Sequence, residues 1–263
     1  MENKISIINK EVNDYLKKEE YDKALDLLFT SSKEGLENKE YMLYTSSLIL
    51  LLNTYNIMNL DIKITEVIEE LKSFLELDYL ENNIDNATIY FDTGSNLNKI
   101  GFVTLSLAYF NKAIYSYKNS LEKNTLLLKD ILEEVVPILY LKEQYLEVVN
   151  LNEMFINEVG EDSYEFHFEV LAASNEIVKS LFSVEAPFRE IELLEKYLKL
   201  SYRIIMSIKI DDTDVYLIAK NISAYLDYLD MKNLADNINK KTVEYYNMLL
   251  EEAKNEWRNK LPF

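Results

Sequence analysis

The sequence predicts an all-α fold in which helical hairpins stack into a superhelical solenoid. Apolar residues recur at spacings of three and four through most of the chain, as in Tyr21, Leu25 and Leu28. The 263 residues include only 4 Gly and 3 Pro, too few for the frequent tight turns of an all-β protein. Helices that alternate with short polar turns at a near-constant interval are typical of a repeat architecture.

Six short, mostly polar segments divide about twelve expected helices into hairpins. These segments are Lys18–Glu20, Asn59–Asp61, Lys99–Gly101, Lys142–Gln144, Ser183–Pro187 and Asp230–Asn233. We therefore expect a single domain over 1–263 in which the hairpins repeat with a period of about 42 residues. Its hairpins would span 1–38, 39–80, 81–122, 123–160, 161–210 and 211–258, with a C-terminal tail at 259–263.

Three expected helices have distinctive local features. Tyr41–Leu60 carries no charge, but its wholly apolar part is only Leu48–Leu52, so we predict a buried helix and not a membrane span. Pro137 lies inside the expected helix Leu126–Leu141 and should kink it. Asp211–Asp214 precedes an apolar run, and acidic residues in this position indicate a helix start.

The composition excludes several classes of function. With 46 acidic and 28 basic residues the net charge is −18, which disfavours nucleic-acid phosphates as partners. The absence of cysteine removes disulfides and thiolate chemistry, and a single histidine cannot build a multi-histidine metal site. The N-terminal residues lack the apolar core of a secretion signal. We expect a cytoplasmic protein with no cofactor, no metal and no catalytic residues.

One hairpin carries a pattern of small and aromatic residues at fixed spacing. Its residues are Tyr90, Gly94, Leu97, Gly101, Ser106, Phe110 and Ala113. This pattern resembles the tetratricopeptide repeat, with departures at Thr93, Ser106 and Lys118. The resemblance implies that Gly94 lets the two helices approach closely and that Gly101 makes the turn between them.

The long repeats also resemble those of signal-peptide receptors from low-GC Gram-positive bacteria, which implies a bacterial peptide-binding protein. Many such receptors carry an N-terminal helix-turn-helix. Here the repeat pattern begins by Ile5, so we expect no such DNA-binding domain.

Acidic residues and one histidine are the first candidates for chemistry. Residues between Ile131 and Val170 are strongly acidic, and Glu161, Glu165 and Glu169 recur every fourth position, which predicts a stripe on one helical face. The stripe is either a solvated surface or a surface that attracts a basic partner. His167 has no ligand partner three or four positions away, so we interpret it as a partly buried, hydrogen-bonded residue.

Amide and aromatic side chains on the first helix of each hairpin are the second set of candidates. In a superhelix of hairpins the first helices line the concave side, where side-chain amides can pair the backbone of an extended peptide. Six residues of this kind, together with Lys220, lie on or at the ends of those helices, and the six are Asn9, Asn13, Asn98, Tyr140, Asn175 and Asn221.

These observations predict a non-enzymatic module that binds a peptide or a segment of another protein. Such a module could be a receptor for a signalling peptide or an adaptor with a constant partner. An enzyme or effector with a carboxylate-built site between repeats is the alternative. The last helix has an apolar character that either caps the end of the solenoid or forms a homodimer contact, through Tyr246, Met248, Leu249, Leu250 and Trp257.

Overall fold

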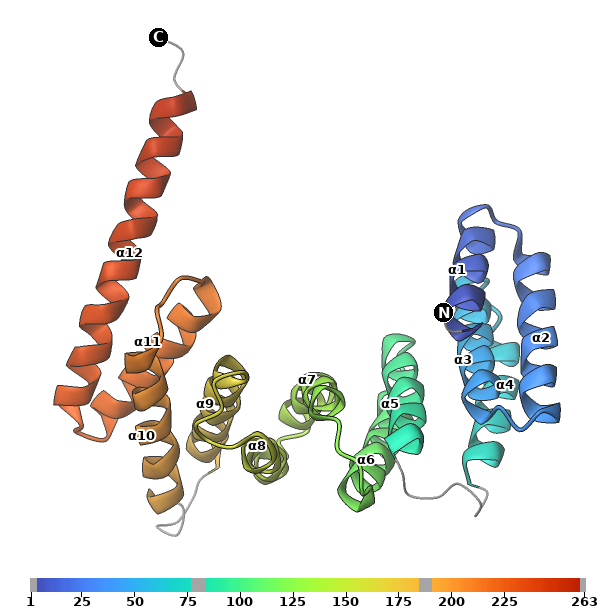
Figure 1. The fold of residues 1–263 in the computed structure, drawn as a ribbon, viewed down its shortest axis with the longest axis horizontal. Coiled ribbons are helices and arrows are strands. Elements are labelled where there is room, and N and C mark those ends of the chain that lie inside the picture. Colours follow the sequence, from blue (N-terminus) through green and yellow to red (C-terminus); the bar gives the residue numbers. More distant parts are fainter. Residues whose placement is uncertain (1–3, 77–83, 185–190, 261–263) are drawn as a thin grey trace. The chain divides into compact units, whose positions relative to one another are not determined.

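The computed structural model describes residues 4–76, 84–184 and 191–260, and this part of the chain consists of helices joined by short connections, with no strand (Figure 1). The all-α prediction is confirmed. The twelve helices of the described residues are α1 (Lys4–Lys17), α2 (Tyr21–Glu37), α3 (Tyr41–Ile57), α4 (Asp61–Leu75), α5 (Ile84–Lys99), α6 (Val103–Asn119), α7 (Thr125–Leu141), α8 (Tyr145–Val159), α9 (His167–Ser183), α10 (Ile191–Ser207), α11 (Thr213–Tyr228) and α12 (Lys232–Lys260).

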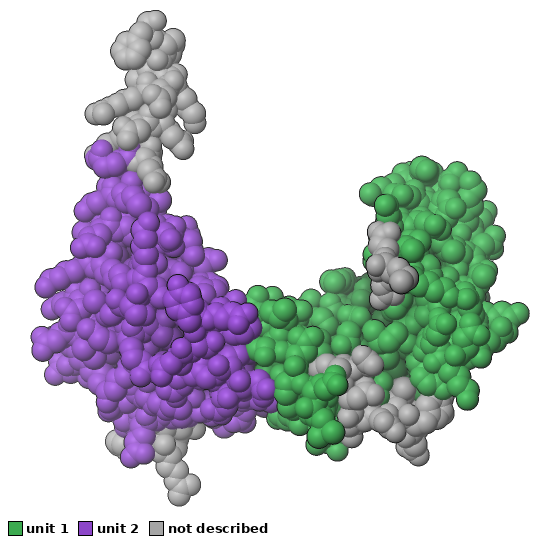
Figure 2. Space-filling model, viewed as in Figure 1, with its two compact units in different colours: residues 1–138 green, residues 139–263 purple. Residues whose placement is uncertain are grey.

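The chain divides into two compact units, Met1–Ile138 and Leu139–Phe263 (Figure 2). Within each unit, helices pack on their neighbours in sequence: α5 packs on α6 in unit 1, and α8 on α9 in unit 2. Odd-numbered helices also meet across hairpins, as α3 and α5 do in unit 1 and α9 and α11 in unit 2. This sequential packing is consistent with a helical solenoid.

The turns inside the hairpins share one backbone conformation. Glu19, Asn59, Gly101, Glu143 and Asp230 all have positive φ, between 55° and 91°. In each turn the residue after the positive-φ residue donates its backbone N–H to the carbonyl five residues earlier. Phe102 donates to Leu97 at 2.8 Å in this way, and Gln144 donates to Leu139 at 2.9 Å. This is the Schellman helix ending, which satisfies carbonyl groups at the end of the first helix. The predicted turn at Ser183–Pro187 extends outside the described residues.

The packing of α5 on α6 confirms the roles expected for Gly94 and Gly101. A Cβ atom at Gly94 would lie 2.9 Å from the Phe110 ring, so only glycine permits this approach. Phe110 and Ala113 of α6 are completely buried against α5. Gly101 has a φ of +91°, a conformation that other residues adopt at a cost.

The other local predictions concern α3, α7 and α11. The side chains of Leu48, Leu51 and Leu52 are each only 1 % exposed. The prediction that this helix, α3, is buried is therefore confirmed. No helix in the described residues is both long enough and apolar enough to cross a membrane. Pro137 lies inside α7, which continues to Leu141. Asp212 caps α11 by accepting a hydrogen bond from the Val215 N–H at 2.9 Å.

Candidate functional site

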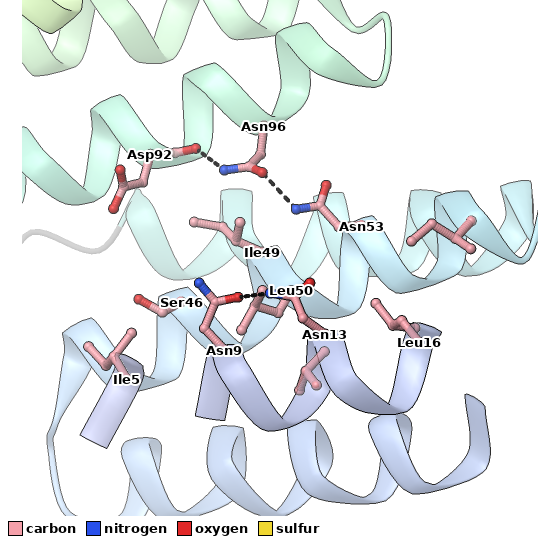
Figure 3. Close-up of a pocket in the computed structure, with 12 residues that line it drawn as sticks. Ile5, Asn9, Asn13, Leu16, Ser46, Ile49, Leu50, Asn53, Asp92 and Asn96 are labelled. Carbon is pink, nitrogen blue, oxygen red and sulfur yellow. Dashed lines mark hydrogen bonds between the residues drawn. The ribbon is translucent and has the colours of Figure 1, made fainter. Parts of the chain in front are cut away.

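A pocket of about 360 Å³ opens between α1, α3 and α5 in unit 1 (Figure 3). Its lining is half polar and half apolar. The twelve lining residues are Ile5, Asn9, Val12, Asn13 and Leu16 from α1, Ser46, Ile49, Leu50, Asn53 and Ile57 from α3, and Asp92 and Asn96 from α5. Each set recurs every three or four residues, because those positions share one face of a helix.

The polar side of the pocket is made of four asparagines joined in two pairs. Nδ2 of Asn13 donates to Oδ1 of Asn9 at 2.9 Å within α1. Nδ2 of Asn53 donates to Oδ1 of Asn96 at 2.7 Å and so joins α3 to α5. Asn96 in turn donates to the backbone carbonyl of Asp92 at 2.8 Å, and this bond fixes its rotamer. We call these residues the amide pairs.

Each of these pairs leaves hydrogen-bonding atoms facing the pocket. An asparagine amide has two donors and one acceptor oxygen, and each pair uses one donor and one oxygen. Oδ1 of Asn13, Oδ1 of Asn53 and Nδ2 of Asn9 make no other hydrogen bond within the described residues. They can therefore accept from and donate to a bound group.

The apolar side of the pocket is anchored in the core of unit 1. Val12 and Ile49 are buried at 1 % and 7 % exposure, whereas Leu50 and Leu16 are half-buried. Because α1 and α3 pack directly on one another, this side of the pocket is held by core contacts.

A second pocket, also of about 360 Å³, lies between α5 and α7 in unit 1, and Asp92 and Asn96 line both pockets. Half of its eight lining residues are acidic. The residues are Phe91, Asp92, Ser95, Asn96 and Lys99 from α5, and Asp130, Glu133 and Glu134 from α7. Four carboxylates and one lysine give this pocket a negative potential.

The four carboxylates have different environments. Glu134 accepts hydrogen bonds from the Ser95 hydroxyl at 3.0 Å and from Nδ2 of Asn98 at 3.2 Å. Glu133 pairs with Lys129 at 3.2 Å along α7. Burial raises the pKa of Asp92 to about 6, which nearby Lys99 only partly offsets. The Asp130 pKa is also raised, first by burial and then by the charge of Glu133.

The structure brings only some of the predicted site residues together. Asn9 and Asn13 line the first pocket, and Asn98 lies beside the second, where it holds Glu134. Sequence reasoning missed Asn53, Asn96 and Asp92. Asp92 and Asn96 are spaced four apart on a first helix, as Asn9 and Asn13 are, and this spacing was a usable signal.

In unit 2, the Tyr140 side chain packs between α7 and α9, and α9 supplies its partners. Its hydroxyl donates to the Glu176 carbonyl at 3.2 Å and shares a 2.7 Å hydrogen bond with Ser180. The Lys179 ammonium lies 4.3 Å from the Tyr140 ring centroid. Burial raises the pKa of Tyr140, so its hydroxyl stays protonated.

The other predicted residues of unit 2 lie apart from Tyr140. Asn175 is buried in α9, and its Oδ1 has no hydrogen-bond partner in the described part of the chain. Lys220 donates to Oδ1 of Asn239 at 3.1 Å, which joins α11 to α12. Asn221 is exposed.

The predicted helical stripe of Glu161, Glu165 and Glu169 is wrong. Gly160, with a φ of +87°, ends α8, and α9 begins only at His167. Glu161 and Glu165 therefore lie in the connecting turn, where helical spacing does not apply. Glu161 is neutralised by Lys196 at 3.1 Å and lies 3.6 Å from Arg203.

His167 has the structural role that was predicted. It is half-buried at the first position of α9, and its Nδ1 donates to the Tyr164 carbonyl at 2.6 Å. Among the residues whose positions are described, no three His, Asp or Glu side chains cluster closely enough to hold a metal ion.

No protein-family model matches the chain, and no curated protein matches it significantly.

Proposed function

We propose that this protein is a non-enzymatic binding module, a superhelix of tetratricopeptide-like hairpins that takes an extended peptide or a partner segment. The observation that supports this proposal is the amide-lined pocket across α1, α3 and α5. Its asparagines come from successive odd-numbered helices, and each pair leaves atoms that can bond to a peptide backbone. An extended chain presents alternating N–H and C=O groups that need such partners.

The proposed ligand has both apolar and basic side chains. Leu16, Leu50 and Ile57 provide an apolar surface next to the amides. The acidic pocket continues from the same residues, Asp92 and Asn96, so a chain that leaves the first pocket along α5 meets several carboxylates. These carboxylates would attract a lysine or arginine side chain of the ligand. Its positive charge would in turn stabilise the ionised form of Asp92 and lower the pKa of that carboxyl group.

Binding of synthetic peptides tests this proposal. We would use fluorescein-labelled decapeptide pools with Lys, Glu or Ser at every second position and random residues between. Fluorescence anisotropy should show binding of the Lys pool above the Ser and Glu pools, with lower affinity at high salt because ions screen the acidic pocket.

Variants locate the binding surface. The double change Asn13→Ala and Asn53→Ala should weaken binding at least tenfold, because two amides facing the pocket are lost. Asn119→Ala is the matched control, since Asn119 is an exposed asparagine on α6 that bonds only to the Tyr115 carbonyl. The proposal fails if no pool binds to folded protein, or if the double variant binds as tightly as the wild type.

The raised pKa of Asp92 favours a second candidate, an enzyme or effector whose site is built from the carboxylates between α5 and α7. A carboxyl group that titrates near pH 6 can serve as a general acid or base. Mass spectrometry of the same peptide pools after incubation separates the two candidates. Cleavage or modification that Asp92→Asn abolishes would favour the enzyme, and unchanged peptides would favour the binding module.

A further inference from the structure

We propose that a further pocket of unit 1, formed by α5 and α6, binds a carboxylate group that is attached to an aromatic ring. The proposal does not depend on what binds between α1, α3 and α5. It rests on a lysine without an acidic partner, on a buried hydroxyl that no protein group uses and on the tyrosine rings beside them.

This pocket has a volume of about 380 Å³, which lies within the usual range of small-molecule sites. Its lining residues are Tyr90 from α5 and Asn111, Lys112, Tyr115 and Ser116 from α6. We call it the Lys112 pocket. None of these five residues lines the amide pocket or the acidic pocket. Tyr90 and Asp92 are two residues apart on α5 and therefore point to nearly opposite sides of that helix, so the Lys112 pocket is a separate site.

The Lys112 ammonium makes no ion pair and no hydrogen bond within the described residues. Its nitrogen lies 5.7 Å from the Tyr90 ring centroid and 5.5 Å from the Tyr109 ring centroid. These distances are near the outer limit for a cation–π contact, so the rings leave the N–H groups of the ammonium available. An ammonium has three hydrogen-bond donors and no acceptor. Lys112 can therefore donate to an anion that enters the pocket.

A buried serine provides a second unused donor. Ser116 is only 2 % exposed, and its hydroxyl forms no hydrogen bond in the part of the chain that the structure describes. Buried serines such as Ser47 in α3 donate to the carbonyl four residues earlier, which is Leu43 at 2.8 Å. A buried hydroxyl without a partner costs free energy unless a ligand or a water molecule bonds to it. Ser116 therefore favours a polar occupant of this pocket.

Two tyrosine rings give the pocket an aromatic character. Tyr90 is buried and stacks on Tyr109 with ring centroids 6.4 Å apart, so its position is fixed by the core. The Tyr115 side chain is 61 % exposed and has ring surface available for a flat apolar group. Asn111 is also exposed, and its amide can donate or accept at the same site. The pocket thus combines donors for an anion with surface for a ring.

The charges near the pocket favour a ligand with one negative charge. α6 contains two lysines, Lys112 and Lys118, and no acidic residue. Only Lys112 lines the pocket. Burial, and after it the charge of Glu76, raises the pKa of the Tyr109 phenol to about 12, so negative charge already lies close by. One ammonium can neutralise a carboxylate, whereas a phosphate dianion would keep an uncompensated charge in this region.

Titration of the full chain with sodium benzoate, followed by nuclear magnetic resonance, tests the proposal. The backbone amide signals of Asn111, Lys112 and Ser116 should shift and saturate, with a dissociation constant of about 1 mM for so small a probe. Benzamide has the same shape without the charge, and acetate has the charge without the ring. Each should bind about tenfold more weakly than benzoate, and inorganic phosphate should also bind more weakly.

A second titration distinguishes two sources of this chemistry. A free aromatic acid and the C-terminal aromatic residue of a peptide both carry a carboxylate beside a ring. N-acetylphenylalanine represents the peptide terminus. Tighter binding of benzoate supports a free acid as the ligand, and tighter binding of N-acetylphenylalanine supports a peptide C-terminus.

Variants test the roles of the two donors. Lys112→Met keeps the length of the side chain but removes its charge, so benzoate should bind about tenfold more weakly. Lys118→Met is the matched control, since Lys118 is an exposed lysine of the same helix that does not line the pocket, and it should leave binding unchanged. Ser116→Ala should weaken binding about threefold.

Circular dichroism checks that each variant remains helical. If Lys112→Met loses helicity, Ser116→Ala and the comparison of benzoate with benzamide decide the question. The proposal is overturned if benzoate causes no saturable shifts at the lining residues, or if benzamide or phosphate binds as tightly as benzoate. It is also overturned if a folded Lys112→Met variant binds benzoate as tightly as the wild type.

Discussion

The two units join their odd-numbered helices with different chemistry. In unit 1, α3 and α5 are joined by the 2.7 Å hydrogen bond between Asn53 and Asn96, beside an open pocket. In unit 2, α9 and α11 are joined by Phe182 stacked on Tyr225 with ring centroids 4.3 Å apart. Two amides that bond to each other leave donors, acceptors and volume for a ligand, whereas stacked rings fill their space. The same helical arrangement can therefore make a binding surface or a structural contact.

The largest expected effect comes from breaking the aromatic contact of unit 2. Phe182→Ala removes the stack on Tyr225 and the edge contact to Tyr228, whose centroid lies 5.5 Å away. Because Phe182 is only half-buried, we expect a loss of about 2 kcal/mol in the free energy of unfolding, below the range for a fully buried ring. Urea denaturation followed by circular dichroism measures this loss.

Asn53→Ala is the matched change in unit 1. It removes one hydrogen bond at a solvent-accessible pocket, so its cost should stay under about 1 kcal/mol. Equal losses for the two variants would contradict the distinction between a structural contact and an open pocket.

Features set by local sequence could be predicted, whereas features set by the packing of distant helices could not. Helical spacing and scarce breakers sufficed to predict an all-α fold, and the small residues around Gly94 correctly indicated a close helix pair. The prediction of Asn9 and Asn13 rests on their shared face of a first helix, and both residues line the first pocket. The spacing of Asp92 and Asn96 on a first helix carries the same local signal. Asn53 has no such signal, because its position in the pocket depends on how α3 and α5 meet, which no local pattern records.

The acidic stripe and Tyr140 show how the fold alters the environment that a local pattern implies. The predicted stripe required helical spacing to continue through Gly160, but the positive φ there ends α8. The prediction of Tyr140 as a binding residue takes no account of Ser180 and Glu176, which are far away in sequence and hydrogen-bond to its hydroxyl in the folded chain. Local sequence shows which side chains are capable of binding but does not show which are already occupied.

Another prediction concerns the cost of keeping the Asp92 carboxylate charged beside the pockets of unit 1. The pKa of Asp92 is about 6 in the folded chain and near its ordinary value of 3.8 when unfolded. The folded state therefore binds more protons between these values, and stability falls as pH rises from about 4 to about 6. Above pH 6 the Asp92 carboxylate is charged although partly buried, and the loss of folding stability reaches its full size.

Asp92→Asn should relieve that cost. We expect a gain of about 1 kcal/mol at pH 7, discounted for the partial exposure of the side chain, and no gain below about pH 4. Thermal denaturation across pH measures both. Glu133→Gln is the control, because Glu133 is exposed and paired with Lys129. A gain of equal size at pH 3.5 would show that charge is not the cause.

The final prediction compares one turn from each unit. Gly101 of unit 1 and Glu143 of unit 2 occupy the same place in the Schellman turn, with φ of 91° and 58°. A glutamate pays for this left-handed conformation by steric contact between its Cβ and the backbone, and glycine does not. Glu143→Gly should therefore raise the free energy of unfolding by about 0.5–1 kcal/mol, and Gly101→Ala should lower it by about 1 kcal/mol. Lys142→Gly, one residue before the left-handed position, should bring no gain, because its backbone does not need glycine. If Glu143→Gly were neutral or destabilising while Gly101→Ala still cost stability, the Glu143 side chain would have a stabilising role that outweighs the strain of its turn.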